Sequence, residues 1–147
     1  CHTRRQRQMC IRDRLVTHDI NDSLNIADKI LVFKAGKLQQ YSDPVEMYCK
    51  PANCYCARIL GSINKFEMDT KPYYIRPEKI NIVANSDVKL IVEKSLFQGK
   101  EYNITAKYGQ EIWSLFSSVP YKKDEIIYVS FEKDDLIYFP PNCLNYF

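Results

Sequence analysis

Hydrophobic and polar residues alternate along the second half of the chain, from about residue 73 onward. The stretch EYNITAKY places Tyr102, Ile104, Ala106 and Tyr108 on one face of an extended chain. Further short apolar segments are DVKLIVEKSLF (87–97), EIWSLF (111–116), EIIYVSF (125–131) and LIYF (136–139). Five or six short strands within about 70 residues predict an all-β region that closes into a small barrel or sandwich to hide its edges.

The first part of the chain follows a different pattern, in which short apolar runs alternate with segments of helical spacing. The runs RLVTH (14–18) and KILVF (29–33) predict buried strands. Between them, residues 20–27 repeat apolar side chains at helical spacing after Asp19, a candidate helix N-cap. The sequence KAGKLQQY (34–41) then predicts a turn and a returning strand.

Two short helices are predicted before the β region begins. Residues 42–46 (SDPVE) combine a polar cap, Pro in the first helical position and Glu in the first turn, and Pro51 ends this helix. A second helix should run from about residue 52 to 60, with Gly61 as its stop. The break between the two parts of the chain is predicted at residues 62–72.

Length and composition indicate a soluble globular protein of one or two small domains. The chain has 147 residues, of which 46% are hydrophobic and 27% charged. No apolar run approaches the roughly 18 residues of a membrane span, and no secretory signal pattern opens the sequence. The default expectation is therefore a cytosolic protein.

The first fourteen residues, CHTRRQRQMCIRDR, carry five Arg and one Asp and account for the whole positive net charge. A basic arm that binds nucleic acid is one interpretation of this stretch. It also resembles translated sequencing-adapter read-through joined to a gene fragment, and we treat residues 1–14 as a non-native leader without a function.

Four cysteines lie outside this leader, at Cys49, Cys54, Cys56 and Cys143. Their spacing does not match a zinc ribbon or finger, in which paired ligands lie two to four residues apart and a second pair follows. No metal site is therefore predicted. Cys54 and Cys56 fall in an amphipathic segment, which predicts buried free thiols.

One set of residues, in a fixed order and spacing, resembles a known family. The set comprises Val16-Thr17-His18-Asp19, Ala27-Asp28-Lys29-Ile30, Gly36-Lys37, Gln40, Asp43-Pro44, Glu46-Met47-Tyr48, Pro51, Asn53, Ala57, Leu60-Gly61 and Tyr74-Ile75-Arg76-Pro77-Glu78. It is similar to the C-terminal part of the ATP-binding subunit of ABC importers, in the subgroup that serves polyamine, ferric iron, sulfate or sugar uptake. The resemblance covers residues 15–139.

The resemblance implies a fold class: an α/β remnant of a P-loop ATPase domain, followed by an all-β OB-type barrel, the TOBE domain. It assigns residues 15–66 to the C-terminal end of the ATPase domain, 72–140 to the barrel and 141–147 to a tail. Two positions depart from the family pattern, because Ser42 replaces a usual Gly and Ile20 a common polar residue. The sequence contains no phosphate-loop motif. We therefore expect the C-terminal fragment of a longer ATPase.

The resemblance assigns chemistry to His18. In ATPases of this type a phosphate loop holds ATP with Mg²⁺, and a histidine at a strand end hydrogen-bonds the γ-phosphate and positions the attacking water. His18 would be both the catalytic residue and the ATP γ-phosphate ligand, with ATP and Mg²⁺ as cofactors of the full-length parent. The tripeptide THD alone favours a histidine that satisfies local backbone groups. This chain by itself is expected to be inactive.

The resemblance also implies partners and a location. Such ATPases pair as two subunits docked on transmembrane permease subunits, so we expect a cytoplasmic protein that is peripheral on the inner face of the cell membrane. Trp113, the only tryptophan, is a candidate anchor between two subunits or else a core residue. Arg76 and Glu78 either contact the ATPase core or a partner, or form a barrel-entry turn in which Pro77 fixes the backbone and Arg76 makes a salt bridge.

A function of another class remains open at this point. A stand-alone OB-type barrel would bind a small oxyanion or single-stranded nucleic acid, and the eleven tyrosines would fit base stacking. No nucleic acid is expected, however, because Tyr102 and Tyr108 share the face of Ile104, which predicts core positions. The chain after the leader also has no basic excess. A stand-alone barrel would not need residues 15–61.

Overall fold

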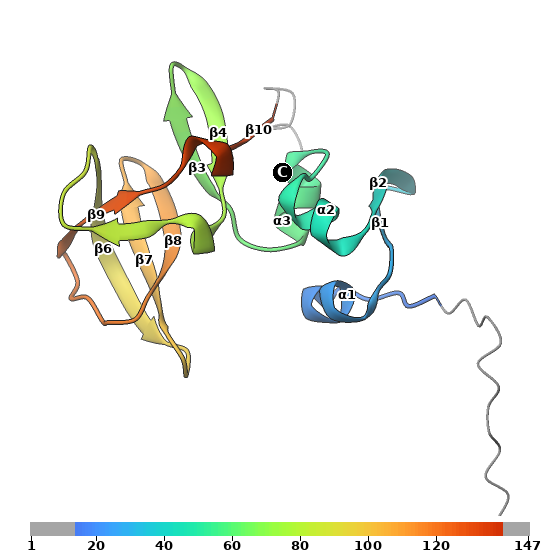
Figure 1. Cartoon of the computed structure of the whole chain (residues 1–147), viewed down its shortest axis with the longest axis horizontal. Helices are drawn as coiled ribbons and strands as arrows, with labels where there is room; N and C mark the ends of the chain where they lie inside the picture. The colour runs from blue at the N-terminus through green and yellow to red at the C-terminus, as the bar shows by residue number, and fades with distance from the viewer. Residues whose placement is uncertain (1–13, 140–147) are drawn as a thin grey trace, which may run out of the picture.

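The computed structural model describes residues 14–139, which form a small helical region and a β domain (Figure 1). The helical region contains α1 (Ile20–Ile26), β1 (Ile30–Lys34), β2 (Lys37–Ser42), α2 (Pro44–Cys49) and α3 (Cys54–Ile59). The β domain contains β3 (Asn64–Met68), β4 (Lys71–Ile75), β5 (Asn81–Val83), β6 (Val88–Phe97), β7 (Tyr102–Tyr108), β8 (Glu111–Ser117), β9 (Ile126–Ser130) and β10 (Ile137–Tyr138), with the 3₁₀ helices η1 (Pro77–Lys79) and η2 (Lys133–Asp135). The leader up to residue 13, Cys143 and the predicted tail lie outside the described residues.

Helix α1 begins where the sequence predicts, because Asp19 acts as its N-cap. The Asp19 carboxylate accepts hydrogen bonds from the backbone amides of Asn21 (2.8 Å) and Asp22 (3.4 Å), which would otherwise lack a partner at the helix start. The preceding stretch 14–18 is not a strand, so that prediction is wrong. A strand needs a hydrogen-bonded neighbour, and none of the described strands pairs with this stretch.

Strands β1 and β2 form a two-stranded antiparallel hairpin, which confirms the predicted turn and returning strand. The turn residues Ala35 and Gly36 both have positive φ, 48° and 74°. Two consecutive residues with positive φ characterise the tight hairpin turn that matches the twist of the strands, and glycine adopts this conformation without strain.

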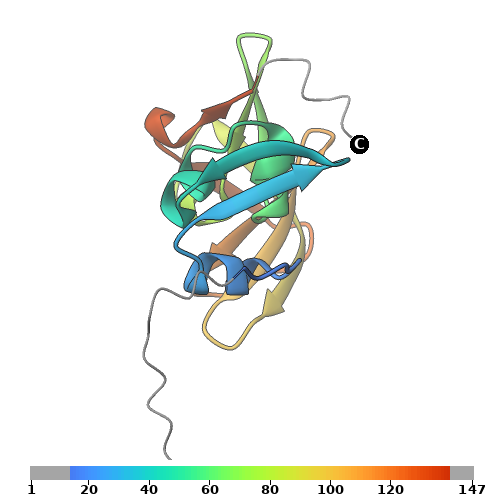
Figure 2. The ribbon, with the colours of Figure 1, turned by 90° about the vertical axis from the view of Figure 1, so that its right-hand side faces the viewer.

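The two faces of this hairpin differ in burial. The inner face places Ile30 and Val32 in an apolar cluster with Met47 of α2. The outer face carries side chains that are each more than half exposed, and we call it the outer hairpin face: Leu31, Phe33, Leu38 and Tyr41. Figure 2 shows the hairpin on the side of the molecule that points away from the β domain. Strand β1 is thus buried on one face only within residues 14–139.

Helix α2 starts at the predicted cap, and α3 starts two residues after its predicted start, at a cap that was not predicted. The Asp43 carboxylate accepts from the backbone amide of Glu46 (2.9 Å), with Pro44 in the first helical position. The Asn53 side chain accepts from the backbone amide of Cys56 (2.9 Å). These contacts satisfy amides that a helix start leaves without partners. Cys54 and Cys56 are buried free thiols, as predicted.

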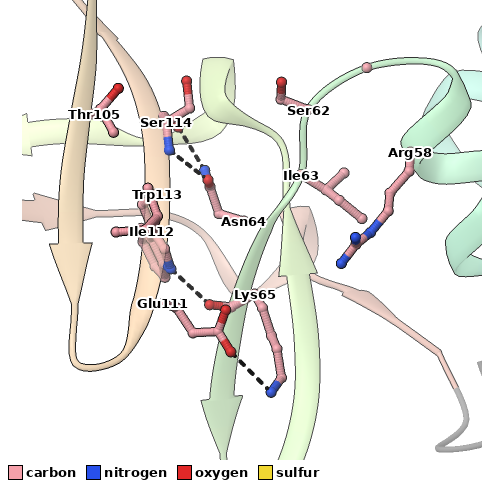
Figure 3. A pocket seen from close by; sticks show the side chains of 11 residues that line it. Arg58, Ser62, Ile63, Asn64, Lys65, Thr105, Glu111, Ile112, Trp113 and Ser114 are labelled. Carbon is pink, nitrogen blue, oxygen red and sulfur yellow. Dashed lines mark hydrogen bonds and ion pairs between the residues drawn. The ribbon is translucent and has the colours of Figure 1, made fainter. Parts of the chain in front are cut away.

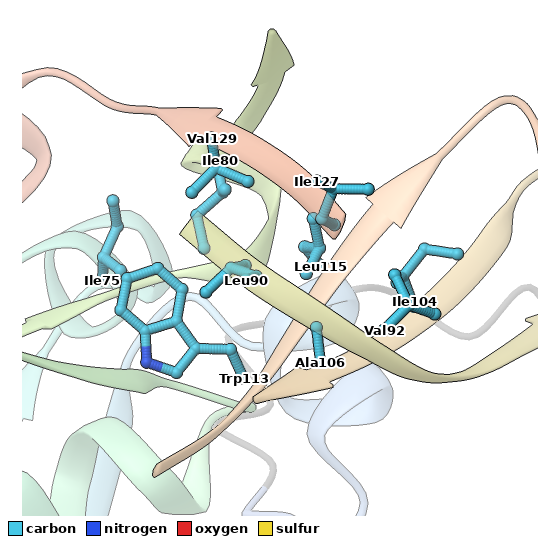
Figure 4. Close-up of a cluster of buried hydrophobic side chains, with 10 residues drawn as sticks. All are labelled: Ile75, Ile80, Leu90, Val92, Ile104, Ala106, Trp113, Leu115, Ile127 and Val129. Carbon is cyan, nitrogen blue, oxygen red and sulfur yellow. The ribbon is translucent and has the colours of Figure 1, made fainter. Parts of the chain in front are cut away.

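The β domain is built on a five-stranded antiparallel sheet with the order β5-β9-β6-β7-β8. The sheet curls into a half-barrel (Figure 1). Its inner face carries buried apolar residues, which pack with Ile75 at the end of β4 and Ile80 after η1 into one core (Figure 4). The residues from the sheet are Leu90, Val92, Ile104, Ala106, Trp113, Leu115, Ile127 and Val129. Tyr102 and Tyr108 pack against this core, as expected from the face that they share with Ile104.

Strand β3 occupies part of the stretch where the sequence predicts a break between the two regions. It pairs with β4, and β10 pairs with the other edge of β4, giving a second sheet with the order β10-β4-β3. The turn between β3 and β4 contains Asp69 and Thr70, both with positive φ (51° and 64°). Residues other than glycine rarely adopt this conformation, so the sequence carries no clear turn signal here.

Candidate functional site

His18 lies in the extended segment that leads into α1, and its side chain is exposed. The local hydrogen bonds are made by its neighbours, because the Asp19 amide donates to Thr17 Oγ1 (2.9 Å) and the Asp19 carboxylate caps the helix. These hydrogen bonds fix the backbone on both sides of His18, and the imidazole takes part in none of them. This arrangement leaves the side chain accessible to a ligand, although it does not by itself assign one.

The described chain can contribute little else to an ATP site. The imidazole of His18 fits a hydrogen bond to a phosphate oxygen, whereas phosphate-loop amides and their lysine are not part of this sequence. Within residues 14–139, no group of three or more His, Cys, Asp or Glu side chains could hold a metal ion. In the same residues no helix is long and apolar enough to span a membrane.

Arg76 lies at the junction between the helical region and the β domain and is only 4% exposed. Its guanidinium donates to the backbone carbonyls of Ala57 (2.8 Å), Gly61 (3.0 Å), Ser62 (3.3 Å) and Tyr48 (3.3 Å). The predicted salt bridge of Arg76 is wrong, because these carbonyls rather than a carboxylate surround the charge. The same contacts place Arg76 against the region that precedes the β domain, which fits the alternative in which this residue contacts that region.

Glu78 faces a different group. Its carboxylate accepts a short hydrogen bond (2.6 Å) from the hydroxyl of Tyr48. Pro77 opens the 3₁₀ helix η1 directly after β4, which fits the predicted barrel-entry turn. Arg76 and Glu78 therefore both contact α2, while the turn between them fixes the direction of the chain.

An open depression of ≈ 670 Å³ lies beside this junction, between the chain after α3 and strand β8 (Figure 3). Among the residues that line it, Asn64 uses its side-chain amide to hydrogen-bond the backbone of β8, as a neighbouring strand would. Asn64 Nδ2 donates to the Ser114 carbonyl (2.7 Å), and Asn64 Oδ1 accepts from the Ser114 amide (2.8 Å). One side chain thus makes the pair of hydrogen bonds that a strand would make, and it joins β3 to β8.

Lys65 lines the depression, and its positive charge is paired with carboxylates of this chain. The Lys65 ammonium lies 3.0 Å from the Glu67 carboxylate and 3.3 Å from that of Glu111. These contacts, with Glu67 first, raise the pKa of Lys65. Lys65 is therefore engaged with two carboxylates rather than presented to a small oxyanion.

Trp113 lies in the core of the β domain and has no exposed surface. Its ring packs edge-on against Phe66 and at a tilt against Tyr108, with ring centroids 6.1 Å and 5.0 Å away. Its indole Nε1 donates to the Lys65 carbonyl (2.8 Å). The interpretation of Trp113 as an anchor between two subunits is wrong, and the alternative of a core residue is confirmed.

The amino-acid sequence of the chain is similar to those of several known proteins. No family model matches the chain. The chain is 27% identical over 158 aligned positions to the spermidine/putrescine import ATP-binding protein PotA of Clostridium novyi, covering 89% of this chain and 46% of that protein. For the PotA protein of Aggregatibacter actinomycetemcomitans, the identity is 28% over 132 positions, covering 90% of this chain and 29% of the relative. The chain is a homologue of PotA.

A third relative is more similar in sequence, but over a shorter segment. The PotA protein of Vibrio cholerae is 42% identical over 65 residues, which cover 44% of this chain and 17% of that protein. The PotA homologue described here thus spans less than half the length of each of these three relatives. The resemblance to ABC importer ATP-binding subunits is confirmed at the level of homology.

Two residues that organise this part of the PotA homologue, one within the β domain and one at the junction, were not singled out by the sequence. Asn64 falls in a polar stretch without a motif, and only its burial (2% exposed) and its two backbone bonds reveal its role. Tyr48 belongs to the family-like set, but its pairing with Arg76 and Glu78 depends on tertiary contacts. The RPE motif was the one local signal that pointed to this part of the chain.

Replacing Asn64 with alanine is expected to lower the free energy of unfolding by about 2 kcal/mol. The change leaves the amide and carbonyl of Ser114 without their partner, and each lost bond to a buried group costs on the order of 1 kcal/mol or more. Urea unfolding followed by circular dichroism measures the loss. Asn103→Ala is the matched control, because the Asn103 side chain hydrogen-bonds the Ser114 hydroxyl (3.2 Å) rather than its backbone, and its loss should cost under about 1 kcal/mol. Equal losses in the two variants would contradict the prediction.

Proposed function

We propose that this chain is the C-terminal part of the ATP-hydrolysing subunit that powers an ABC-type polyamine importer. The observation that carries the proposal is homology to spermidine/putrescine import ATP-binding proteins across about 90% of the chain. In this proposal the helical region is the end of the ATPase domain and the half-barrel is an OB-type, TOBE-like domain. The parent subunit would pair with a second ATPase subunit and dock on transmembrane permease subunits from the cytoplasmic side.

The outer hairpin face supports the assignment of the helical region to a larger domain. Four neighbouring apolar side chains, each more than half exposed, are costly to leave in water, and such patches mark surfaces that another part of a protein covers. The relatives are more than twice as long as the segment that aligns with this chain. In the parent, the remainder of the ATPase domain would cover this face.

His18 supplies the chemical role in this proposal. ATP, bound with Mg²⁺ by the parent, provides the phosphoanhydride bond whose hydrolysis drives transport. His18 would donate a hydrogen bond to a γ-phosphate oxygen and hold the attacking water in place. The Asp19 cap and the Thr17 hydroxyl fix the backbone that carries the imidazole. The chain alone, without phosphate-loop residues in its sequence, is expected to show no ATP hydrolysis.

The decisive experiment uses the tagged full-length parent in cells that lack their own spermidine importer. We expect the parent to sediment with the membrane only when its permease subunits are expressed with it, and to restore uptake of radiolabelled spermidine in that case. In this proposal the permease subunits recruit the parent to the membrane.

The control is the same parent expressed without the permease genes, which should stay in the cytosolic fraction. Stable association with nucleic acid, or secretion, would overturn the assignment to an importer. Membrane association and ATP hydrolysis without spermidine uptake would keep the ATPase assignment and refute polyamine as the transported solute.

A further inference from the structure

Within residues 14–139, a small apolar cluster, against which Ile63 and Ile137 also pack, joins the helical region to the β domain. Cys54 and Ala57 of α3 pack against Tyr74 and Phe139 of the β domain, and these four residues form their own cluster, separate from the barrel core. The cluster has four buried members, compared with ten in the barrel core. The polar contacts around Arg76 lie at the same junction.

Arg76 acts as a C-terminal cap for two helices at once. The Tyr48 carbonyl lies at the end of α2, and the Ala57 carbonyl lies in the last turn of α3, followed by the chain that carries the Gly61 carbonyl. The last carbonyls of a helix have no partner within the helix and carry partial negative charge, which a cation stabilises. The forked guanidinium reaches both helix ends because its two terminal nitrogens point in different directions.

Tyr48 of α2 contacts two side chains of the β domain, Arg76 and Glu78. Its ring lies under the guanidinium of Arg76, 4.1 Å from the guanidinium carbon to the ring centroid, and its hydroxyl donates to Glu78. Burial, together with the hydrogen bond to Glu78, raises the pKa of Tyr48 to about 12. The hydroxyl is therefore protonated at neutral pH and can act as the donor. The β domain thus reaches α2 and α3 through Arg76, and α2 reaches the β domain through Tyr48.

We propose that Arg76, Tyr48 and Glu78 form an inter-domain clamp that makes α2 and α3 open and close together with the β domain. Arg76 and Glu78 belong to the β domain and Tyr48 belongs to α2. Releasing Arg76 leaves buried carbonyls of the two helix ends without their partner, and releasing Tyr48 or Glu78 removes the exposed hydrogen bond that holds the Tyr48 ring under the guanidinium. When the clamp is broken, α2 and α3 should open locally while the barrel core stays folded. The inference does not depend on ATP hydrolysis by the parent.

Hydrogen exchange of the complete 147-residue chain, read by mass spectrometry, tests this inference. In Arg76→Met we expect exchange of the amides of residues 44–60 to rise at least about tenfold, with exchange in β7 and β8 changing less than about twofold. Arg76→Lys should recover only part of the protection, because one ammonium keeps the charge but cannot span both helix ends.

The matched control is Lys79→Met, which removes a positive charge three residues away. Lys79 is half exposed and pairs with Asp135 at 3.2 Å, outside the clamp, so exchange in residues 44–60 should not change. Unchanged exchange of these residues in Arg76→Met would overturn the proposal. An equal rise in the helices and in β7 and β8 would also overturn it, because Arg76 would then support the barrel itself.

A milder pair of variants keeps the test decisive even if Arg76→Met fails to fold. Tyr48→Phe and Glu78→Ala each remove one side of the 2.6 Å hydrogen bond. Each should raise exchange in α2 by about threefold or more, and the double variant should be no worse than the stronger single variant. Effects that multiply in the double variant would show that the two residues act separately, which contradicts the clamp.

Discussion

Replacing Trp113 with alanine is expected to lower the free energy of unfolding by about 3–5 kcal/mol, the cost typical of removing a large buried aromatic side chain. Trp113 has no exposed surface and contacts Phe66 from β3, so its loss leaves a cavity where two sheets meet. The same change removes the donor to the Lys65 carbonyl. Urea unfolding followed by far-UV circular dichroism measures the effect, because the chain then contains no tryptophan for fluorescence.

The neighbouring residue provides the control for this variant. Ile112 precedes Trp113 on β8 but points outward and is 52% exposed, so Ile112→Ala should change the free energy of unfolding by less than about 1 kcal/mol. Trp113→Phe should lie between the two, since it keeps an aromatic ring but loses the indole donor. A stable Trp113→Ala variant that had lost only self-association would restore the interpretation of Trp113 as an interface residue.

In the full-length parent, His18→Ala is expected to reduce the rate of ATP hydrolysis by about 100-fold or more while nucleotide binding is retained. A residue that positions the attacking water and contacts the γ-phosphate typically contributes at least this factor to the rate. Binding should persist because the phosphate loop and Mg²⁺, rather than His18, hold the nucleotide. Phosphate release measures hydrolysis, and a fluorescent ATP analogue measures binding.

Asp19→Asn is the matched control for this site. Asparagine is as good an N-cap as aspartate, so α1 and the backbone beside His18 should keep their positions and hydrolysis should remain close to that of the parent. Normal hydrolysis in His18→Ala would remove His18 from the mechanism. A loss of nucleotide binding in that variant would indicate a role in affinity rather than in the chemical step.

The parts of the fold that were predicted correctly depend on rules that act over a few residues. Asp19 and Asp43 were recognised as caps because a short acceptor before a helical segment has few other uses. Strand β7 was recognised because strict alternation reports one buried and one exposed face. Both signals can be read without knowing what lies elsewhere in the chain.

The parts that were missed depend on partners that are distant in sequence. Strand β3 contains only two apolar residues in NKFEM, and its place is set by Asn64 binding Ser114, fifty positions later. The stretch 14–18 has the composition of a strand but lacks a paired neighbour among the described residues. The environment of Arg76 could not be predicted either, because backbone carbonyls, which every residue carries, surround its charge.

The way β3 joins β8 has a consequence for how this domain could be inherited. A barrel that passes between genes as a cassette must carry every group that its core requires. Here the acceptor for the Trp113 indole is the Lys65 carbonyl, and Phe66 fills the space beside the indole ring. A recombination point near residue 72 would leave both behind, whereas one near Gly61 would keep them. We therefore expect gene fusions that exchange this barrel to begin close to the end of α3.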